Sequence, residues 1–247
     1  MVAKTVALPN IRKLFLPDPD HYIIDCDLAQ ADAQVVAWEA HDEELKSIFR
    51  DPNADLHDEN CKTIFGRLTP QERQLAKTGV HATNYGASAR TLASSLGILV
   101  RDAERFQNAW FRAHPGIRDW HRRVEADLAA TRSVRNRFGY WRYYFDRIEG
   151  VLPQALAWIP QSTVALVIDH GLVNIDENIP EAQNLLQVHD SIVLQFHKKH
   201  YPSILPRIRD QLLITVPYED PLIIQVGCAI SDKSWGDVKE IDWPVAA

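Results

Sequence analysis

The sequence predicts an α+β fold, in which an antiparallel sheet with packed helices is interrupted by a long helical segment. Three observations predict it: a strand-like apolar run at 21–29, a hairpin-like sequence at 185–196, and a mainly helical stretch from Glu59 to Asp146 between them. The chain has 247 residues, of which 46% are hydrophobic, enough for a well-buried core.

The first expected elements are a strand and a helix. "HYIIDCDLA" at 21–29 reads as a short strand that runs into a helix. "LAQADAQVVAWEAHDEELKSIF" at 28–49 follows, with apolar residues at helical spacing, and predicts one helix. "DPNADLH" at 51–57 then breaks the pattern.

The helical stretch that follows is basic. Residues 62–147 contain 16 Lys and Arg and 7 Asp and Glu, a balance of +9, whereas the rest of the chain has 11 and 26, a balance of −15. Acidic ends around a basic insert suit a metal site beside a surface that binds a polyanion. An ordinary solvated helical surface explains the same bias equally well. The stretch ends in the aromatic run "FGYWRYYF" at 138–145.

One helix in this stretch has a marked start and a polar face. Thr69, Pro70 and Glu72 have the order of a capping box with proline at the first helical position. At 100° per residue, four polar residues share an arc of about 80°, with Tyr85 just beyond it. These residues are Arg73, Lys77, His81 and Asn84. Two cations one turn apart suit phosphates, and an aromatic ring near the helix end can meet a base, although a solvated basic face is the simpler reading.

The C-terminal third predicts a helix at 153–175, a hairpin, a helix at 202–214 and a strand at 221–230. His189, Asp190 and Ser191 form the hairpin tip between strands 185–188 and 192–196. A turn alone would explain these residues. However, Asp27 ends the first strand, and pairing of the two strands would bring both aspartates to one edge of a sheet. Asp25 lies on the same face by strand alternation.

Together these segments resemble the polymerase module of family A DNA polymerases, the bacterial polymerase I group with its phage relatives. "DCDLAQADAQ" is similar to the first motif of the palm subdomain, "RQLAKTGVHATNYG" to the helix of the fingers subdomain, and "QVHDSIV" to the third motif. Three positions depart from the common pattern, namely Ala29 for serine, His81 for phenylalanine or tyrosine, and Ser191 for glutamate.

The resemblance implies an antiparallel palm sheet interrupted by helical fingers. Residues 1–41 would be the first part of the palm with Asp27, residues 42–150 the fingers, and residues 151–247 the second part of the palm with Asp190. The thumb and exonuclease domains of the family would precede Met1. The implied activity is template-directed DNA polymerisation, the transfer of a nucleotide from a deoxynucleoside triphosphate to a primer 3′ hydroxyl, by a minimal or split polymerase module.

The resemblance also assigns roles to residues. Asp27 and Asp190, with the backbone carbonyl of Leu28, would hold two Mg²⁺ ions, the hard cations that oxygen ligands favour. Lys77 would donate a proton to pyrophosphate. The implied nucleotide-binding residues are Arg73, Lys77, His81, Tyr85, His57, Gln30 and Asp32, and the implied primer and template contacts are His189 and Gln161.

Two alternatives remain open. A single-subunit RNA polymerase also has a His-Asp-Ser motif, as at His189 to Ser191, but it would need a small residue where Asp32 stands. A non-catalytic DNA-binding subunit could retain the fold, although both aspartates are intact.

The expected partners are primer-template DNA, deoxynucleoside triphosphates and a separate chain that supplies thumb or exonuclease functions. Three dispersed cysteines without a CxxC spacing favour a reducing compartment, and no apolar run approaches the roughly 20 residues that span a bilayer. We therefore expect a soluble protein, without membrane partners, in the cytoplasm of a bacterial or phage-infected cell.

Overall fold

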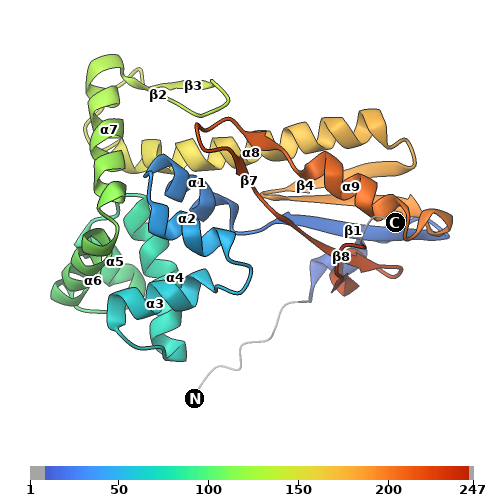
Figure 1. Ribbon diagram of the computed structural model, residues 1–247, viewed down its shortest axis with the longest axis horizontal. Coiled ribbons are helices and arrows are strands. Elements are labelled where there is room, and N and C mark those ends of the chain that lie inside the picture. The colour runs from blue at the N-terminus through green and yellow to red at the C-terminus, as the bar shows by residue number, and fades with distance from the viewer. Residues whose placement is uncertain (1–8, 245–247) are drawn as a thin grey trace. The chain divides into compact units, whose positions relative to one another are not determined.

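The computed structural model describes residues 9–244, which form two compact units (Figure 1). The sheet unit contains residues 9–29, 165–215 and 223–244, and the helical unit contains residues 30–164 and 216–222. The ends of the expected palm segments, residues 1–8 and 245–247, lie outside the described residues. Residues 30–41 and 151–164, which we expected with the sheet, belong to the helical unit. The assignment of palm and fingers by role stays a prediction.

A five-stranded antiparallel sheet is the centre of the sheet unit, in the order β4-β5-β1-β8-β9. Its strands are β1 (His21–Leu28), β4 (Ala182–Val188), β5 (Ser191–His197), β8 (Val226–Ser231) and β9 (Lys239–Glu240). β1 pairs with β5 on one side and with β8 on the other. Ile23, Ile24 and Cys26 of β1 are buried, so this strand crosses the interior of the unit. The α+β fold with an antiparallel sheet is confirmed.

Helices pack against this sheet. The C-terminal half of α8 (Leu152–Asn178) and α9 (Ile204–Leu212) belong to this unit, with the short helices η1 (Ile11–Leu14), η2 (Lys198–His200) and η3 (Trp235–Asp237). A Cβ atom placed on Gly171 of α8 would lie 2.8 Å from Leu212 and 3.7 Å from Ile192 of β5. Glycine at this position therefore lets α8 approach both α9 and the sheet closely.

Seven helices, the first half of α8 and a small hairpin make up most of the described helical unit. They are α1 (Ala31–Glu39), α2 (Glu43–Arg50), α3 (Leu56–Phe65), α4 (Pro70–Asn84), α5 (Ala89–Leu96), α6 (Val100–Ala113), α7 (Pro115–Thr131), and the hairpin of β2 (Ser133–Arg135) and β3 (Trp141–Tyr143). The short strands β6 (Thr215–Val216) and β7 (Leu222–Ile223) pair where the chain enters and leaves this unit for the last time.

The prediction of one helix over 28–49 is wrong, because the chain breaks between α1 and α2. His41 has a positive φ of 51°, which ends the first helical run. The side chain of Asp42 then accepts a hydrogen bond from the backbone N–H of Leu45 at 2.9 Å and caps α2. The other oxygen of Asp42 lies 3.0 Å from Nδ1 of His114, and both side chains are buried. This long-range contact fixes the break.

Two other elements differ from the predictions. The single strand expected at 221–230 is divided into β7 and β8. The end of the stretch expected to be mainly helical is the β2–β3 hairpin. The predicted hairpin near the C-terminus is present, with a turn of two residues, His189 and Asp190, because Ser191 is already the first residue of β5.

Among the described residues, α8 alone has the length and composition of a helix that could cross a membrane. Several of its apolar side chains are buried, among them Leu156, Ile159, Val167, Ile168 and Ile175. Packing in the interior of the two units accounts for its apolar sequence, and the expected absence of membrane partners stays a prediction.

We predict that Gly79→Ala destabilises the helical unit. A Cβ atom at this position of α4 would clash with the buried ring of Phe106 on α6. The distance between this Cβ atom and the nearest ring carbon would be shorter than in any normal van der Waals contact. Overpacking of about 1–3 kcal/mol should exceed the gain of about 1 kcal/mol from replacing a helical glycine. Chemical denaturation measures the difference. Thr78→Ala, an exposed neighbour, is the matched control, and equal stability of the two variants would contradict the packing role of Gly79.

Candidate active site

Two aspartates lie where β1 and β5 meet in the sheet unit. The Cα atom of Asp27 pairs with that of Ser191, and the backbone N–H of Leu28 donates a hydrogen bond to the carbonyl oxygen of Asp190 at 3.0 Å. His189 has a positive φ of 55°, which allows a turn of two residues and puts Asp190 directly before β5. The strand pairing that we expected from the sequence is therefore present.

The surroundings of Asp27 raise the pKa of its carboxyl group. Burial, the neighbouring charge of Asp190 and that of Asp25 raise the pKa of Asp27 from 3.8 to about 6, while Arg12 opposes the shift. Like charges held close together disfavour ionisation of both carboxyl groups. A bound cation would reverse this effect, since it stabilises both ionised carboxylates.

Asp25, the other aspartate on this face of β1, is engaged elsewhere. Its Oδ2 atom accepts a hydrogen bond from the indole N–H of Trp235 at 2.6 Å. Its Oδ1 atom is buried and has no hydrogen-bond partner among the described residues. Asp27 is exposed, so Asp27 is the more accessible ligand of the two.

The donor set of the aspartate pair fits a magnesium ion that shares its ligands with a substrate. The described residues contain no group of three or more His, Cys, Asp and Glu side chains that could hold a metal ion. The two carboxylates offer only oxygen atoms, as the backbone carbonyl of Leu28 would. Mg²⁺ commonly takes one or two carboxylates and completes its six ligands with water and substrate phosphates.

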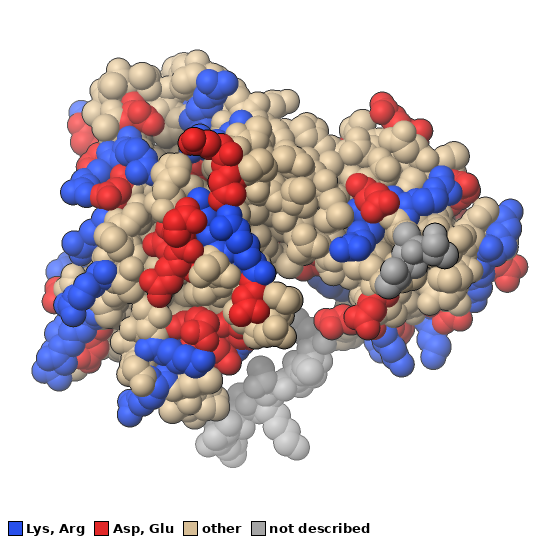
Figure 2. All heavy atoms as spheres, viewed as in Figure 1, with Lys and Arg blue, Asp and Glu red and all other residues tan. Residues whose placement is uncertain are grey.

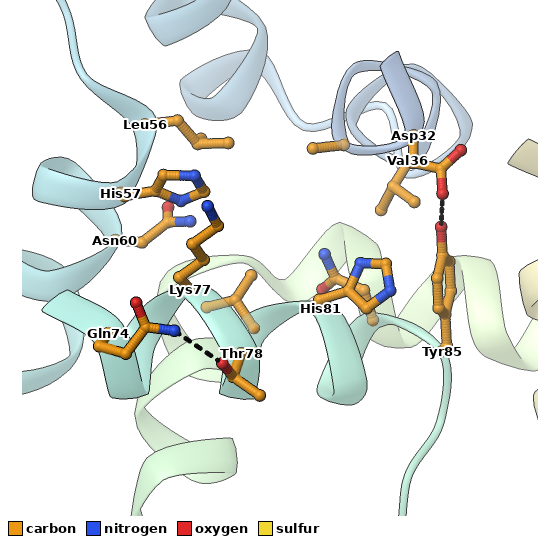
Figure 3. A pocket seen from close by; sticks show the side chains of 13 residues that line it. Asp32, Val36, Leu56, His57, Asn60, Gln74, Lys77, Thr78, His81 and Tyr85 are labelled. Atoms are coloured by element: carbon orange, nitrogen blue, oxygen red, sulfur yellow. Dashed lines mark hydrogen bonds between the residues drawn. The ribbon is translucent and has the colours of Figure 1, made fainter. Parts of the chain in front are cut away.

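A second feature, a pocket of about 330 Å³, lies within the helical unit between α1, α3 and α4 (Figure 3). It brings together five of the predicted site residues: Asp32, His57, Lys77, His81 and Tyr85. Asn84, which was expected on the same polar face, also lines the pocket, whereas three further polar residues of the lining were not predicted from the sequence: Asn60, Gln74 and Thr78. Gln74 and Thr78 lie one turn apart on α4, so helical periodicity beside Lys77 could have indicated them.

One end of this pocket is formed by a hydrogen bond between α4 and α1. The hydroxyl of Tyr85 donates to Oδ2 of Asp32 at 2.9 Å. Burial and the charge of Asp32 hold the pKa of Tyr85 well above its usual value, so the hydroxyl keeps its proton. The ring of His81 meets that of Tyr85 edge-on, with centroids 4.6 Å apart. The three side chains form a compact polar group at the end of α4.

The other end of the pocket holds a cation and a histidine. Lys77 extends from α4 toward the ring of His57 on α3 (Figure 3). Burial and the charge of Lys77 lower the pKa of His57, so His57 is neutral at pH 7. The Nδ1 atom of His57 is buried and has no hydrogen-bond partner among the described residues. Lys77 thus supplies positive charge beside an unpaired ring nitrogen, an arrangement suited to an anionic ligand.

Arg73, one turn before Lys77, does not line this pocket. Its guanidinium pairs with Asp55 at 2.7 Å and with Asp58 through a short hydrogen bond. These pairs raise the pKa of Arg73 above its usual value. Asp55 also caps α3 by accepting from the backbone N–H of Asp58 at 2.9 Å. An anion at Arg73 must therefore compete with two carboxylates, which the sequence analysis did not foresee.

The polar face predicted for α4 is only partly correct. The helix start at Thr69 is confirmed, since the backbone N–H of Glu72 donates to Oγ1 of Thr69 at 3.2 Å and the Thr69 hydroxyl donates to Oε2 of Glu72 at 2.8 Å. Asn84, however, is buried rather than on a solvated face, and its Oδ1 accepts from the indole N–H of Trp110 at 2.8 Å. Asn84 also lines the pocket, so it lies on the expected face of α4, but there Trp110 of α6 supplies a buried partner.

The remaining predicted residues lie outside this pocket. Gln30 is the exposed N-cap residue of α1, with a φ of 49°. Gln161 is an exposed residue of α8 in the helical unit, and His189 is exposed at the hairpin turn of the sheet unit. Their roles as nucleotide, template and primer contacts stay predictions.

The basic excess of the helical stretch does not form an uninterrupted surface. On the face that Figure 2 shows, Lys and Arg side chains alternate with Asp and Glu side chains over the helices. Several of these charges are ion pairs within the helical unit, such as Lys62 with Glu59 and Arg67 with Glu72. The charge balance of the sequence therefore overstates the free positive charge.

Comparison with known proteins identifies relatives over most of the chain. Residues 2–237 match the model of the family described as DNA polymerase family A. The chain is 29% identical to "DNA polymerase I, thermostable" of Thermus filiformis over 94% of its own length, and 25% identical to "DNA polymerase I" of Helicobacter pylori over 93%. It spans 29% and 27% of the length of these two proteins.

A solved structure shares the fold. The chain superposes with a TM-score of 0.81 on the "POL domain of Pol1 from M. smegmatis complex with DNA primer-template and dNTP". The sequences are 23% identical, and the match covers 94% of this chain and 44% of that one.

We predict that Asp27 makes the stability of the metal-free protein depend on pH. Its pKa is higher in the folded protein than in the unfolded chain, so the folded state binds the proton more tightly and is relatively more stable at low pH. The contribution of Asp27 should be complete below about pH 4 and should be lost as the pH rises through about 6. Denaturation in EDTA at a series of pH values measures it. Asp27→Asn should flatten this dependence, and an unchanged slope would contradict the assignment.

Proposed function

The chain belongs to DNA polymerase family A, and we propose that it performs template-directed DNA synthesis, adding nucleotides from deoxynucleoside triphosphates to a primer 3′ hydroxyl. The chain spans less than a third of the length of these relatives. The activity of the whole relatives is therefore a proposal for this chain. Primer-template DNA and deoxynucleoside triphosphates are the proposed partners, a proposal supported by the ligands named for the structural relative.

The observation that carries the proposal is the aspartate pair at the junction of β1 and β5. Asp27 and Asp190 come from segments 163 positions apart in the chain, and burial together with the neighbouring charge of Asp190 raises the pKa of Asp27. A fold that maintains such a repulsive pair at an accessible position is typical of a site that binds cations. We propose Asp27, Asp190 and the carbonyl of Leu28 as ligands of two Mg²⁺ ions.

When bound, two such ions activate the primer hydroxyl and neutralise the charge of the leaving pyrophosphate. Asp27 and Asp190 would hold these ions through their carboxylate oxygens. His189, exposed beside Asp190, positions the primer end, and Gln161 contacts the primer-template. Each of these roles depends on a side chain that solvent, and hence DNA, can reach.

The pocket of the helical unit supplies the proposed nucleotide contacts. Lys77 binds the triphosphate and donates a proton to pyrophosphate, and neutral His57, which lines the same pocket, donates a hydrogen bond from its ring N–H to a phosphate oxygen. His81 and Tyr85 offer ring faces to the base. Arg73 binds the phosphates, which replace Asp55 and Asp58 as partners of its guanidinium. Gln30 completes the proposed set.

Asp32 and Tyr85 are proposed to select the sugar. Their hydrogen bond holds an acidic side chain at one end of the pocket, where it narrows the space for a ribose 2′ hydroxyl. The match to a DNA polymerase family does not favour the RNA polymerase alternative or the non-catalytic one.

Two further parts of the proposal concern the cell. A cytoplasmic location in a bacterial or phage-infected cell agrees with the bacterial source of the relatives. A separate chain that supplies thumb or exonuclease functions would lengthen the products made in the presence of a DNA trap. Adding co-encoded proteins to that assay tests its existence.

We predict that Asp27→Asn and Asp190→Asn each abolish primer extension in Mg²⁺ while the fold is retained. Both changes remove a ligand charge without altering side-chain volume. Extension of a labelled primer and circular dichroism are the two measurements. Asp210→Asn, at an exposed position of α9, is the matched control and should keep full activity. Near-normal extension by either site variant would rule out the two-metal assignment.

Lys77 and Arg73 should affect different kinetic constants. Lys77→Ala should lower kcat by about 10²-fold or more, since general acid catalysis contributes on that order. Arg73→Ala should chiefly raise KM, because Arg73 is assigned to binding and is already held by two carboxylates. Steady-state and single-turnover rates separate these effects. If both variants change the same constant equally, the division of roles is incorrect.

Asp32→Ala should raise incorporation of ribonucleotides relative to deoxynucleotides, because it opens the space at the 2′ position. Tyr85→Phe removes the hydrogen bond but leaves the carboxylate, and should therefore have a smaller effect. Competition between the two kinds of triphosphate at one template position measures both. A preference for ribonucleotides in the unmodified protein would instead support the RNA polymerase reading.

A further inference from the structure

The β2–β3 hairpin carries three aromatic rings on one exposed face. Trp141, Tyr143 and Phe145, the aromatic row, have relative exposures of 50%, 56% and 89%. Their rings are nearly parallel: the centroids of Trp141 and Tyr143 are 6.1 Å apart with 22° between the ring planes, and those of Tyr143 and Phe145 are 6.4 Å apart with 24°. Such a large exposed apolar surface is unusual unless it binds something.

The row follows from the strand geometry. Residues i, i+2 and i+4 of an extended chain point to the same face, which aligns positions 141, 143 and 145. The side chain of Asn136 closes the hairpin by accepting from the backbone N–H of Tyr140 at 3.0 Å and donating to Ser162 at 3.0 Å. Beyond β3, the backbone N–H of Tyr144 donates to the carbonyl of Arg132 at 2.8 Å. The rings are therefore presented by an ordered backbone.

The same face carries positive charge. Arg135 pairs with Trp141 across the hairpin, and its guanidinium lies 5.4 Å from the centre of the indole ring. Residues 132–147 contain five arginines and one aspartate. Arg135 also lines a polar pocket of about 580 Å³ with Arg123 and Arg137, beside the carboxylates of Glu39 and Asp127. Arg137 is paired with the carboxylate of Glu39 at 3.0 Å, and Arg123 donates to the backbone carbonyl of Glu39 at 2.5 Å. Arg135 is therefore the arginine of this pocket best placed to contact a phosphate.

We propose that the aromatic row, with Arg135, binds a single strand of nucleic acid, the unpaired part of the template. This inference rests on the proposed function for the identity of the strand. Flat rings in succession suit unstacked bases, since each ring face can stack on a base of any sequence, while arginines contact the phosphates between them. A purely apolar partner would not explain the excess of arginine along the hairpin.

The test is binding of a fluorescein-labelled single strand of about 12 nucleotides to the full chain, measured by anisotropy without metal. The double variant Trp141→Ala/Tyr143→Ala should bind at least about tenfold more weakly, because stacking on each ring contributes on that scale. Trp141→Phe/Tyr143→Phe keeps the rings and should bind within about threefold of the unmodified protein. The unmodified protein should also bind a strand of the same length that lacks bases more weakly than it binds the normal strand.

Tyr140→Ala is the matched control, since Tyr140 is exposed on the same hairpin but is not part of the aromatic row. It should leave the affinity unchanged. Arg135→Gln should reduce the dependence of log affinity on log salt concentration by about 0.7, the value for one phosphate contact on a single strand. Equal affinity of the double alanine variant and the unmodified protein would overturn the inference. The inference would also be overturned if the unmodified protein self-associates through this face while the double alanine variant does not, and both bind the strand with the same affinity.

Primer extension run in parallel keeps this inference apart from the proposed function. Strand binding that depends on the aromatic row, without extension of any primer, would contradict the proposed polymerase activity alone. Normal primer extension, together with equal strand affinity of the unmodified protein and the double alanine variant, would contradict only the role of the aromatic row.

Discussion

The antiparallel pairing of β1 with β5 is the constraint on which the candidate site depends. It sets Asp27 opposite Ser191 and brings the backbone of Asp190 against Leu28. A shift of the register by one residue would turn Asp27 to the other face of the sheet. The buried residues of β1 prevent this shift, because Ile24, Cys26 and Leu28 would then lose their places in the core. Apolar packing along the strand therefore holds two carboxylates together, where burial and their neighbouring charges raise the pKa of Asp27.

In the helical unit, α4 performs two tasks on opposite sides of one helix. Its buried side is anchored to α6 by the close approach of Gly79 to Phe106. Its other side contributes Lys77 and His81 to the pocket, where the bond between Tyr85 and Asp32 fixes the distance to α1. Because the helix is held on its buried side, the side chains that line the pocket share a rigid support, as a binding site for a charged ligand requires.

Local sequence patterns were sufficient for the elements whose signals are local. The helix start at Thr69, the hairpin around Asp190 and the pairing of the strands that carry the two aspartates follow from residues close together in the chain or from simple alternation. The failures involve distant partners. The break at His41 depends on the bond between Asp42 and His114, the burial of Asn84 depends on Trp110, and the neutralisation of Arg73 depends on Asp55 and Asp58. Helical periodicity assigns a residue to a face but not to a partner, so these contacts required the folded structure.

Binding of Mn²⁺, measured by electron paramagnetic resonance, tests most directly whether the aspartate pair is a site for divalent cations. Mn²⁺ accepts the same oxygen ligands as Mg²⁺ and is detected without catalysis. The measurement should include a primer ended with a dideoxynucleotide, its template and the next deoxynucleoside triphosphate, so that all proposed ligands are present and no bond forms. The account predicts bound Mn²⁺ in the unmodified protein and in Asp210→Asn, and its loss in Asp27→Asn and in Asp190→Asn. Equal binding in all four proteins would contradict the central claim.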